Sequence, residues 1–570
     1  MKSFLSKFLQ YKLSPNFLRF LLNLSISILF GSTWFLLLYG HFPLHFSHVD
    51  WIYRLGGDIF QHQLGWEWFR QEPWSFPLGR IEAYGYPFGT YVTYMDSIPL
   101  LAIPFKLLSP LLKQNFQYLG LWELASVIGQ MLMGILILQE YTQSYPQKIL
   151  GASLLVLSPP MIFRAFSHDS LTAQWILLAG FLFIILEYRH KLWRGAWLAL
   201  FAVAMLVHLY FVAMLLPLWI ISLYFRYCRE KKGWALIVDI LIVISLLLIV
   251  GYSIGLFSLH INNLQEDDFG FYSWNLNGFL NPIQNSSTFF KELALGTGGQ
   301  YEGFSYLGLG NLFILPIALI MFFYKDYSHR KLYFLLPFVF IAILFIFIAL
   351  SNKAFLNAAP IWNIPLPKFT ANLFSIFRSS GRFIWPVFYF LVLFGLISLV
   401  RNIRYPILVL ILALLLQLID IQPFYVSKRI NGFNQYQPNL QSEFWQNAAK
   451  TNQHIILIPA TWPLSTIYEP IALYARQNKL TLNWGYFSRA QYDAIAKYAE
   501  GVWEDLKVGR ADKETIYIFW DSDGERLAQE YLSDHMLICQ IDGFSVVFSV
   551  DNKLTQINLD LSRYCVLPSP

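Results

Sequence analysis

Long apolar runs recur along the first three quarters of this sequence and limit what it can fold into. A run of roughly 20 apolar residues is enough to cross a hydrocarbon core of about 30 Å as a helix. Only 13% of the residues are charged, about half the share of an ordinary soluble domain. The pattern therefore predicts a polytopic α-helical membrane protein with about eleven spans. They are expected near residues 18–40, 118–138, 148–164, 171–188, 195–210, 211–226, 234–256, 304–324, 331–350, 383–400 and 405–421.

Basic residues between the runs predict the orientation, because Lys and Arg of short loops are retained on the cytoplasmic side. If all five basic clusters lie inside, the N terminus is cytoplasmic and residues 41–117, 165–170, 257–303 and 351–382 lie outside. Everything after about residue 422 is then exported. The five clusters are Lys2, Lys7, Lys12 and Arg19; Arg189, Lys191 and Arg194; Arg226, Arg229, Lys231 and Lys232; Lys325, Arg330 and Lys331; and Arg401 and Arg404.

The net charge of +6 is spread over these loops, so it indicates topology and excludes a nucleic-acid footprint. The first apolar run is expected to stay as an anchor. It is longer than the roughly 7–15-residue core of a signal peptide, and no small-residue cleavage site follows it.

The segment "SIPLLAIPFKLLSPLLK", residues 97–113, is apolar but contains three prolines. If it crossed the membrane, the basic loops after it would lie on the wrong side. We therefore predict an interfacial or re-entrant helix on the outer surface, following a long first outer loop at residues 41–97.

The chain changes in composition after the last run, which predicts a membrane domain at residues 1–423 and an extracytoplasmic domain at 424–570. "HIILIPA", "TIYIFWDSD" and "HMLICQIDGFSVVFSV" have the alternation of strands, and the last is expected to form a hairpin at Asp542-Gly543. Residues 491–506 have helical periodicity. A small α/β domain follows, which acts as a rigid cap or partner surface in the simplest interpretation. Cys539 and Cys565 both lie in this domain, so they are candidates for a disulfide.

Few ionisable residues lie inside the expected spans, whereas an ion-coupled transporter needs several. Polar residues gather instead in the outer loops, which favours chemistry at the outer interface. The candidate binding residues are Asp58, Asp96, His168, Asp169, Glu302, Tyr306, Arg378 and Arg382.

Each candidate also has a structural interpretation. Asp58 could cap a helix after Gly56-Gly57, and Asp96 could cap the interfacial helix. His168 and Asp169 could cap a loop. Arg378 and Arg382, four residues apart, share one face if a helix has begun there, and bind either a substrate phosphate or lipid head groups.

The motifs "GGDIFQHQLGWEWFRQEPW", "YPFGTYVTYMDSIPLL", "YLGLGNL" and "RSSGRFIWPVFYF" together resemble an uncharacterised bacterial multi-pass family within the GT-C superfamily of membrane glycosyltransferases. The resemblance covers roughly residues 20–420. It implies that Asp58, an acid in the first outer loop, activates the acceptor hydroxyl. Trp66 and Trp68 would anchor the following helix or stack on a sugar. The paired acid of many members is absent, and a lone carboxylate holds a divalent ion poorly, so no metal ligand and no required cofactor is expected.

The preferred hypothesis is a glycosyltransferase of the bacterial inner membrane. It would move a sugar from a polyprenyl-phosphate carrier to an extracytoplasmic glycan, lipid or protein, with Asp58 meeting the two arginines at the outer face. The alternatives are a transporter or flippase of lipid-linked saccharide and a non-enzymatic envelope-assembly protein.

Overall fold

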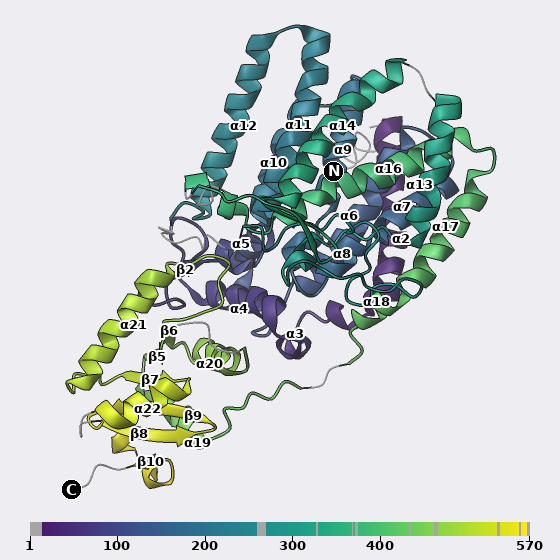
Figure 1. The fold of residues 1–570 in the computed structure, drawn as a ribbon. Helices are drawn as coiled ribbons and strands as arrows, with labels where there is room; N and C mark the ends of the chain where they lie inside the picture. Colours follow the sequence, from purple (N-terminus) through teal and green to yellow (C-terminus); the bar gives the residue numbers. More distant parts are fainter. Residues whose placement is uncertain are drawn as a thin grey trace, which may run out of the picture. The chain divides into compact units, whose positions relative to one another are not determined.

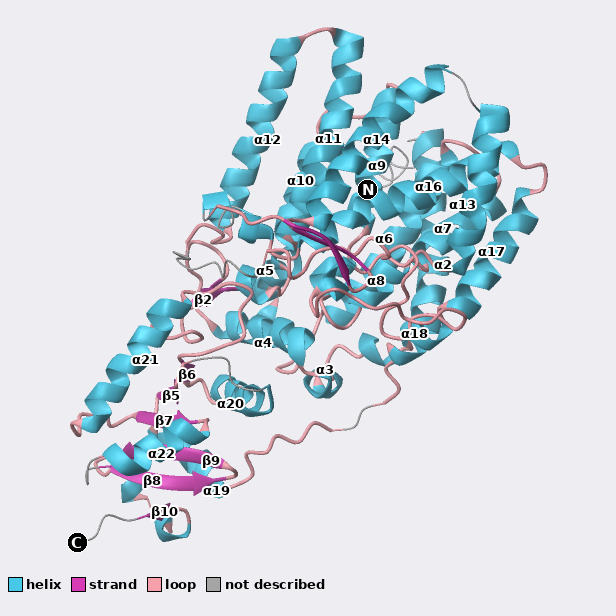
Figure 2. Cartoon of the chain, in the orientation of Figure 1, coloured by secondary structure: helices cyan, strands magenta, loops and turns pink. Residues whose placement is uncertain are grey.

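The computed structural model describes residues 14–258, 269–326, 329–367, 369–370, 374–432, 435–460, 465–532, 536–557 and 560–566. Helices make up most of these residues, and the larger sheet lies in the C-terminal part of the chain (Figure 2). Among the predicted cytoplasmic charges, Lys2, Lys7 and Lys12 lie outside the described residues.

Six helical segments of the described chain are long and apolar enough to cross a membrane. They are Pro15–Tyr39, Leu119–Gln139, Asp169–Tyr188, Leu209–Glu230, Gly233–Ser253 and Ser380–Asn402. Shorter apolar helices at Ala196–Val207, Leu309–Lys325, Phe334–Leu350 and Pro406–Asp420 coincide with four further expected spans. The chain is thus a mostly helical protein with the helices of a membrane protein, while the count of eleven spans stays a prediction.

The span expected at residues 148–164 is not one helix. Helix α7 (Tyr145–Val156) ends before Ser158, and the short helix α8 (Pro159–Arg164) begins at a pair of prolines. Proline lacks an amide hydrogen and restricts the residue before it, so Pro159 and Pro160 start a new helix and cannot continue the old one.

The chain forms two compact units, and each is described by itself. Unit 1 comprises residues 1–45, 118–244 and 265–431, and unit 2 comprises 46–117, 245–264 and 432–570. This division differs from the predicted boundary near residue 423, because it groups residues 46–117 with residues 432–570.

Unit 1 contains the apolar helices (Figure 1). In addition to α7 and α8 they are α2 (Pro15–Tyr39), α6 (Leu119–Gln139), α9 (Trp175–Tyr188), α10 (Ala196–Val207), α11 (Leu209–Glu230), α13 (Leu309–Met321), α14 (His329–Leu350), α16 (Trp385–Asn402), α17 (Pro406–Asp420) and α18 (Gln422–Ser427). Helix α12 (Gly233–Ser253) begins in unit 1, and its last turns belong to unit 2. Strands β3 (Lys353–Leu356) and β4 (Ala359–Asn363) form a hairpin.

Helix α6 lies near the middle of the unit 1 packing. It contacts α2, α7 and α9, while α13 packs against α16 and α17. Most of the candidate polar residues of this unit lie in short segments, among them α8 and the 3₁₀ turns η4 (Asp169–Thr172), η6 (Gln300–Gly303) and η9 (Ser380–Ile384). Turn η4 contacts α6 and α8, and η9 contacts η6, α14 and α16.

The loop predicted to be the first outer loop is folded, and its elements belong to unit 2. They are α3 (Asp50–Leu55), α4 (Gly57–Gln71), the two-stranded sheet β1 (Arg80–Ile81) and β2 (Thr90–Tyr91), the 3₁₀ turn η2 (Val92–Met95) and α5 (Pro99–Leu107). The 9 residues of α5 rise about 14 Å at 1.5 Å per residue. That is less than half of a hydrocarbon core of about 30 Å, so α5 alone is too short to span it.

The tail forms the predicted small α/β fold around a six-stranded sheet of order β10-β8-β9-β7-β5-β6. Its strands are β5 (His454–Ile458), β6 (Thr481–Leu482), β7 (Thr515–Phe519), β8 (Met536–Ile541), β9 (Phe544–Ser549) and β10 (Cys565–Val566); its helices are α19 (Glu443–Thr451), α20 (Ser465–Gln477), α21 (Tyr492–Lys507) and α22 (Ser522–Tyr531). The hairpin at Asp542-Gly543 is confirmed, with φ of 50° and 84° at its two turn residues, as a tight right-twisted hairpin requires. A disulfide joins Cys539 to Cys565 between β8 and β10.

Within unit 2, the outer loop and the tail are held together by buried polar contacts. Arg476 of α20 forms an ion pair with Glu67 of α4, with 2.8 Å between Nε and Oε2. The hydroxyl groups of Tyr84 and Tyr468 are hydrogen-bonded at 2.7 Å. The tail is therefore packed on the first outer loop and is not an independent appendage of the chain.

Candidate functional site

A buried group of three charges occupies unit 1 and comes from three segments far apart in sequence. Arg164 ends α8, Glu302 lies in η6 and Arg382 lies in η9. The same carboxylate oxygen of Glu302 accepts a hydrogen bond from Arg164 Nη2 at 2.5 Å and from Arg382 Nε at 2.8 Å. The three side chains are at most 9% exposed.

This triad contains two arginine side chains and one glutamate side chain. Burial alone would raise the pKa of Glu302, but the charges and hydrogen bonds of the two arginines hold it far below its usual range. Glu302 is therefore ionised, and two guanidinium groups converge on its carboxylate. Guanidinium groups match the oxygens of a phosphate as well as those of a carboxylate.

Arg378 and Arg382 do not share a helix face, because no continuous helix connects them. The turn η8 (Ser375–Phe377) ends at Arg378, and Ser379, whose amide donates to the Tyr210 hydroxyl at 2.9 Å, separates it from η9. Arg378 is half-buried and lies 5.8 Å from the ring centroid of Tyr272, while Arg382 lies 4.7 Å from that of Tyr210. The two arginines thus lie in different environments of unit 1.

Lys428 adds another cation to unit 1, which sequence reasoning missed. Its ammonium donates to the carbonyls of Phe163 and Ala165, both at 2.9 Å. Burial lowers the pKa of Lys428 to about 8, although the nearby carboxylates of Glu123 and Asp169 favour the charged form. In the sequence it was visible only as a lysine eight residues after Asp420, the last residue of α17.

The other predicted residues of unit 1 are buried in polar networks. The Asp169 carbonyl accepts a hydrogen bond from Trp122 Nε1 at 2.7 Å, and His168 Nδ1 lies 3.3 Å from the Ser170 hydroxyl. Tyr306 donates to Asp420 Oδ2 at 2.7 Å, which occupies its hydroxyl hydrogen in a structural contact.

Asp58 lies in unit 2, in the first turn of α4, and is partly exposed. The alternative interpretation of Asp58 as the N-cap of α4 is wrong, because Gly56 holds that position and its backbone has a φ of +64°. The Asp58 carboxylate instead accepts a hydrogen bond from the Tyr486 hydroxyl at 2.9 Å. This contact holds the carboxylate in a fixed orientation while leaving it partly accessible.

A second carboxylate, Glu469 of α20, lies beside the same turn. Its Oε1 accepts a hydrogen bond from the Gly57 amide at 2.9 Å. A β-carbon on Gly56 would lie 3.3 Å from the Glu469 oxygens, so glycine permits this approach. Burial raises the pKa of Glu469, and the amide hydrogen bond partly opposes that effect. Sequence reasoning missed Glu469 because more than 400 residues separate it from Asp58.

Trp66 and Trp68 lie in the core of unit 2. Trp66 is fully buried and donates its indole hydrogen to the Phe116 carbonyl at 3.0 Å. Trp68 is 2% exposed and stacks on Tyr84 with ring centroids 5.4 Å apart. Both indole side chains make buried packing contacts, so they belong to the core of unit 2. The sugar stacking expected of them stays a prediction.

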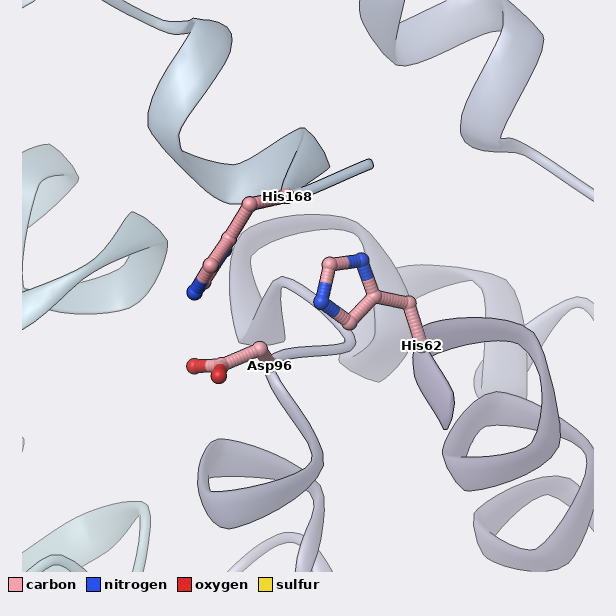
Figure 3. A group of neighbouring side chains, drawn as sticks. All are labelled: His62, Asp96 and His168. Carbon is pink, nitrogen blue, oxygen red and sulfur yellow. The ribbon is translucent and has the colours of Figure 1, made fainter. Parts of the chain in front are cut away.

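Asp96 follows η2 with a left-handed backbone, φ of 52°, and does not cap α5, whose N-cap position is Ile98. The prediction of an Asp96 helix cap is therefore wrong. A carboxylate oxygen of Asp96 and an imidazole nitrogen of His62, which projects from α4, lie within 4.8 Å of each other (Figure 3, which also draws His168 of unit 1). Both side chains are of types that bind divalent metals, and His62 was not among the predicted site residues.

Comparison with models of known protein families identifies the family of this chain. A family model described as "Domain of unknown function (DUF6311)" matches residues 28–422. The chain belongs to the DUF6311 family. The model described as "DUF6311 C-terminal domain" matches residues 444–549. The comparison with curated proteins gives no match.

The candidate residues are divided between the two DUF6311 matches. Asp58 and the Arg164–Glu302–Arg382 triad fall in the first match, while Glu469 and Tyr486 fall in the C-terminal domain match. In this DUF6311 protein the turn that carries Asp58 is therefore completed by side chains of the C-terminal domain.

Proposed function

We propose that this protein is a GT-C-type glycosyltransferase that uses a polyprenyl-phosphate-linked sugar at the outer face of a bacterial inner membrane. The observation that carries the proposal is the buried Arg164–Glu302–Arg382 triad, in which two guanidinium groups share one carboxylate oxygen. Two guanidinium groups held side by side suit the oxygens of the phosphate of a lipid carrier.

The chemistry follows from these roles. An acceptor hydroxyl oxygen attacks the anomeric carbon of the sugar, and its proton passes to the Asp58 carboxylate. The bond between the anomeric carbon and the phosphate oxygen breaks, and polyprenyl phosphate leaves with the electron pair. The arginines stabilise the charge that develops on the phosphate, and a positioned general base contributes about 10²–10⁴ in rate. Inversion at the anomeric carbon is what the GT-C resemblance implies.

Two further observations support this assignment. The apolar helices of unit 1 would provide a protein surface within the bilayer that the lipid of the donor can contact. The disulfide between Cys539 and Cys565 is of a kind that persists in oxidising compartments, which supports an extracytoplasmic tail.

The test uses the full-length protein purified in detergent and a polyprenyl phosphate that carries a radiolabelled hexose. Release of polyprenyl phosphate and transfer of label to water or to an envelope glycan extract are measured. Asp58→Asn is expected to lower the rate by about 10²–10⁴. Asp505→Asn, whose side chain is 53% exposed, serves as the matched control and should be unchanged.

A second comparison separates the two carboxylates. Glu469→Gln keeps an oxygen that can accept the Gly57 amide, so it should lower the rate less than tenfold if Asp58 is the base. A large loss in Glu469→Gln with a small one in Asp58→Asn would reverse the two roles. Absence of any transfer in detergent, together with donor flipping in vesicles, would favour the transporter alternative.

A further inference from the structure

A cavity of about 250 Å³ lies in the tail part of unit 2, at the carboxyl ends of two neighbouring parallel strands. Ile458, the last residue of β5, and Phe519, the last residue of β7, are register partners and both line it. Pro459 and Ala460 continue the lining after β5, and Asp521 and Gly524 continue it after β7.

The position of this cavity follows from the topology of the sheet. Strand β5 lies between β7 and β6, and the chain leaves it toward β6. After β7 the chain leaves in the opposite direction, toward the β8-β9 hairpin. The connections therefore diverge between β5 and β7. In open α/β sheets, ligands bind in the crevice at the carboxyl edge where such connections diverge.

Helix α21 supplies the remaining wall. It packs on the sheet face that carries Ile456, Ile458, Tyr517 and Phe519. From this helix, Trp503 and Glu500 line the cavity together with the small residues Ala496 and Ala499. The ring of Trp503 contacts Phe519 edge-on, with centroids 5.6 Å apart, which fixes the indole at the cavity wall.

The chemistry of the lining selects a class of ligand. The lining contains two carboxylates, Glu500 and Asp521, and the aromatic rings of Trp503 and Phe519, and no Lys, Arg or His is among the lining residues that the structure describes. Carboxylates accept hydrogen bonds and donate none when ionised, so they suit hydroxyl groups and repel phosphate. An indole face packs well on the apolar side of a sugar ring, and pockets of this make-up bind small ligands.

We propose that this cavity is a binding site for a neutral saccharide. Trp503 supplies the stacking surface, and Glu500 and Asp521 accept hydrogen bonds from the sugar hydroxyls. As a docking site for an acceptor glycan this rests on the proposed function, but saccharide binding at the cavity does not require catalysis.

The experiment measures binding without a lipid-linked donor, so that its outcome is independent of transfer. Full-length protein in lipid nanodiscs is mixed with maltotetraose, cellotetraose or mannotetraose, and binding is followed by saturation-transfer NMR and by titration of the tryptophan fluorescence. At least one tetrasaccharide is expected to bind. The double variant Glu500→Gln with Asp521→Asn and the single variant Trp503→Ala should each lower its affinity at least tenfold.

The variants are chosen so that loss of binding is not loss of folding. Asp521 caps α22 by accepting from the Gly524 amide at 2.6 Å, and asparagine caps as well, so the double variant should keep the Tm of the parent. Asp505→Asn is the control, because this residue lies on α21, is 53% exposed and is outside the lining. Asp58→Asn should bind saccharide as the parent protein does, even where it has lost transfer.

Three results would overturn the proposal. They are an absence of binding by all three tetrasaccharides, unchanged affinity in the folded double variant, and binding of tetramethylammonium or inorganic phosphate in place of sugar. The second would move the site elsewhere in the protein, and the third would change its ligand class.

Discussion

Arg476 and Glu67 form an ion pair in unit 2, with 2.8 Å between Nε and Oε2 and side chains only 4% and 2% exposed. The other oxygen of Glu67 accepts hydrogen bonds from Tyr53 Oη at 2.5 Å and Gln63 Nε2 at 2.8 Å. Burial and the nearby Glu67 charge raise the pKa of Tyr53 well above its usual value, which keeps this tyrosine a donor. One carboxylate thus links helix α4 of the first outer loop to helix α20 of the tail.

Arg476→Met should strongly destabilise unit 2. It leaves Glu67 buried without its countercharge, and breaking one side of such a pair costs about 3–5 kcal/mol. We expect a lower Tm and faster proteolytic release of the tail in detergent. The double variant Arg476→Met with Glu67→Gln should recover part of the loss, since no charge is then stranded.

The control for this pair is Arg510→Met, which removes an exposed ion pair with Asp505, at 74% and 53% exposure. Exposed pairs contribute little, so this change should leave Tm within error. Equal effects of the two arginine changes would mean that Arg476 does not link the loop to the tail.

The local elements of the tail could be predicted from the sequence because their signals are local. Alternation of apolar residues indicated β5, β7 and the β8-β9 hairpin, and Asp542-Gly543 supplied the turn. Glu469, by contrast, meets Gly57 only through the packing of α20 on α4. No local pattern marks a contact between residues more than 400 positions apart.

The arginines of unit 1 show a second limit. A spacing of four residues suggests a shared helix face only where the backbone is helical. Ser379 has φ of −82° and ψ of 63°, which ends the helical path between Arg378 and Arg382. Arg164 then takes the place beside Arg382 that the sequence had suggested for Arg378.

Glu302→Gln should destabilise unit 1, because it leaves the guanidinium groups of Arg164 and Arg382 buried beside each other. The expected loss is about 3–5 kcal/mol, measured as thermal unfolding of the purified protein. Glu292→Gln is the control in the same outer loop, since Glu292 is exposed and its contact to the Gln284 amide can be kept by glutamine.

The triad can also be replaced as a whole to separate stability from function. The triple variant Arg164→Met, Glu302→Leu and Arg382→Met buries no charge, so it should be more stable than Glu302→Gln. It should nevertheless fail to bind the polyprenyl-phosphate donor. A triple variant that kept donor binding would show that the triad is structural only.

Lys428 predicts a specific dependence of stability on pH. Its pKa is about 8 in the folded protein against an ordinary value of 10.5, so unfolding takes up a proton between these two values. The contribution of Lys428 to the free energy of unfolding should therefore rise as pH increases from about 8 to 10.5 and stay constant outside that window. The charged groups that act on it are Glu123, Asp169 and Arg164.

The measurement compares wild type with Lys428→Met by denaturant unfolding at several pH values. The difference between the two free energies of unfolding should increase with pH across the window, in favour of wild type. Lys106, whose pKa is also lowered to about 8 by burial, is present in both proteins and cancels in the difference. A flat or falling difference would contradict the burial of the Lys428 ammonium.

Cys228 offers a natural test of the proposed topology. It is an exposed free thiol near the end of α11, beside the basic residues Arg226 and Arg229 that are expected to face the cytoplasm. In cells with a permeabilised outer membrane, a membrane-impermeant maleimide should not label Cys228, and should label it after the inner membrane is disrupted.

Lys479→Cys, made in a Cys228→Ser background on an exposed position of the tail, should instead be labelled before disruption. The paired Cys539 and Cys565 are unreactive in both states until they are reduced, so they do not obscure the result. Labelling of Cys228 in intact cells would place this end of α11 outside and reverse the orientation of the chain.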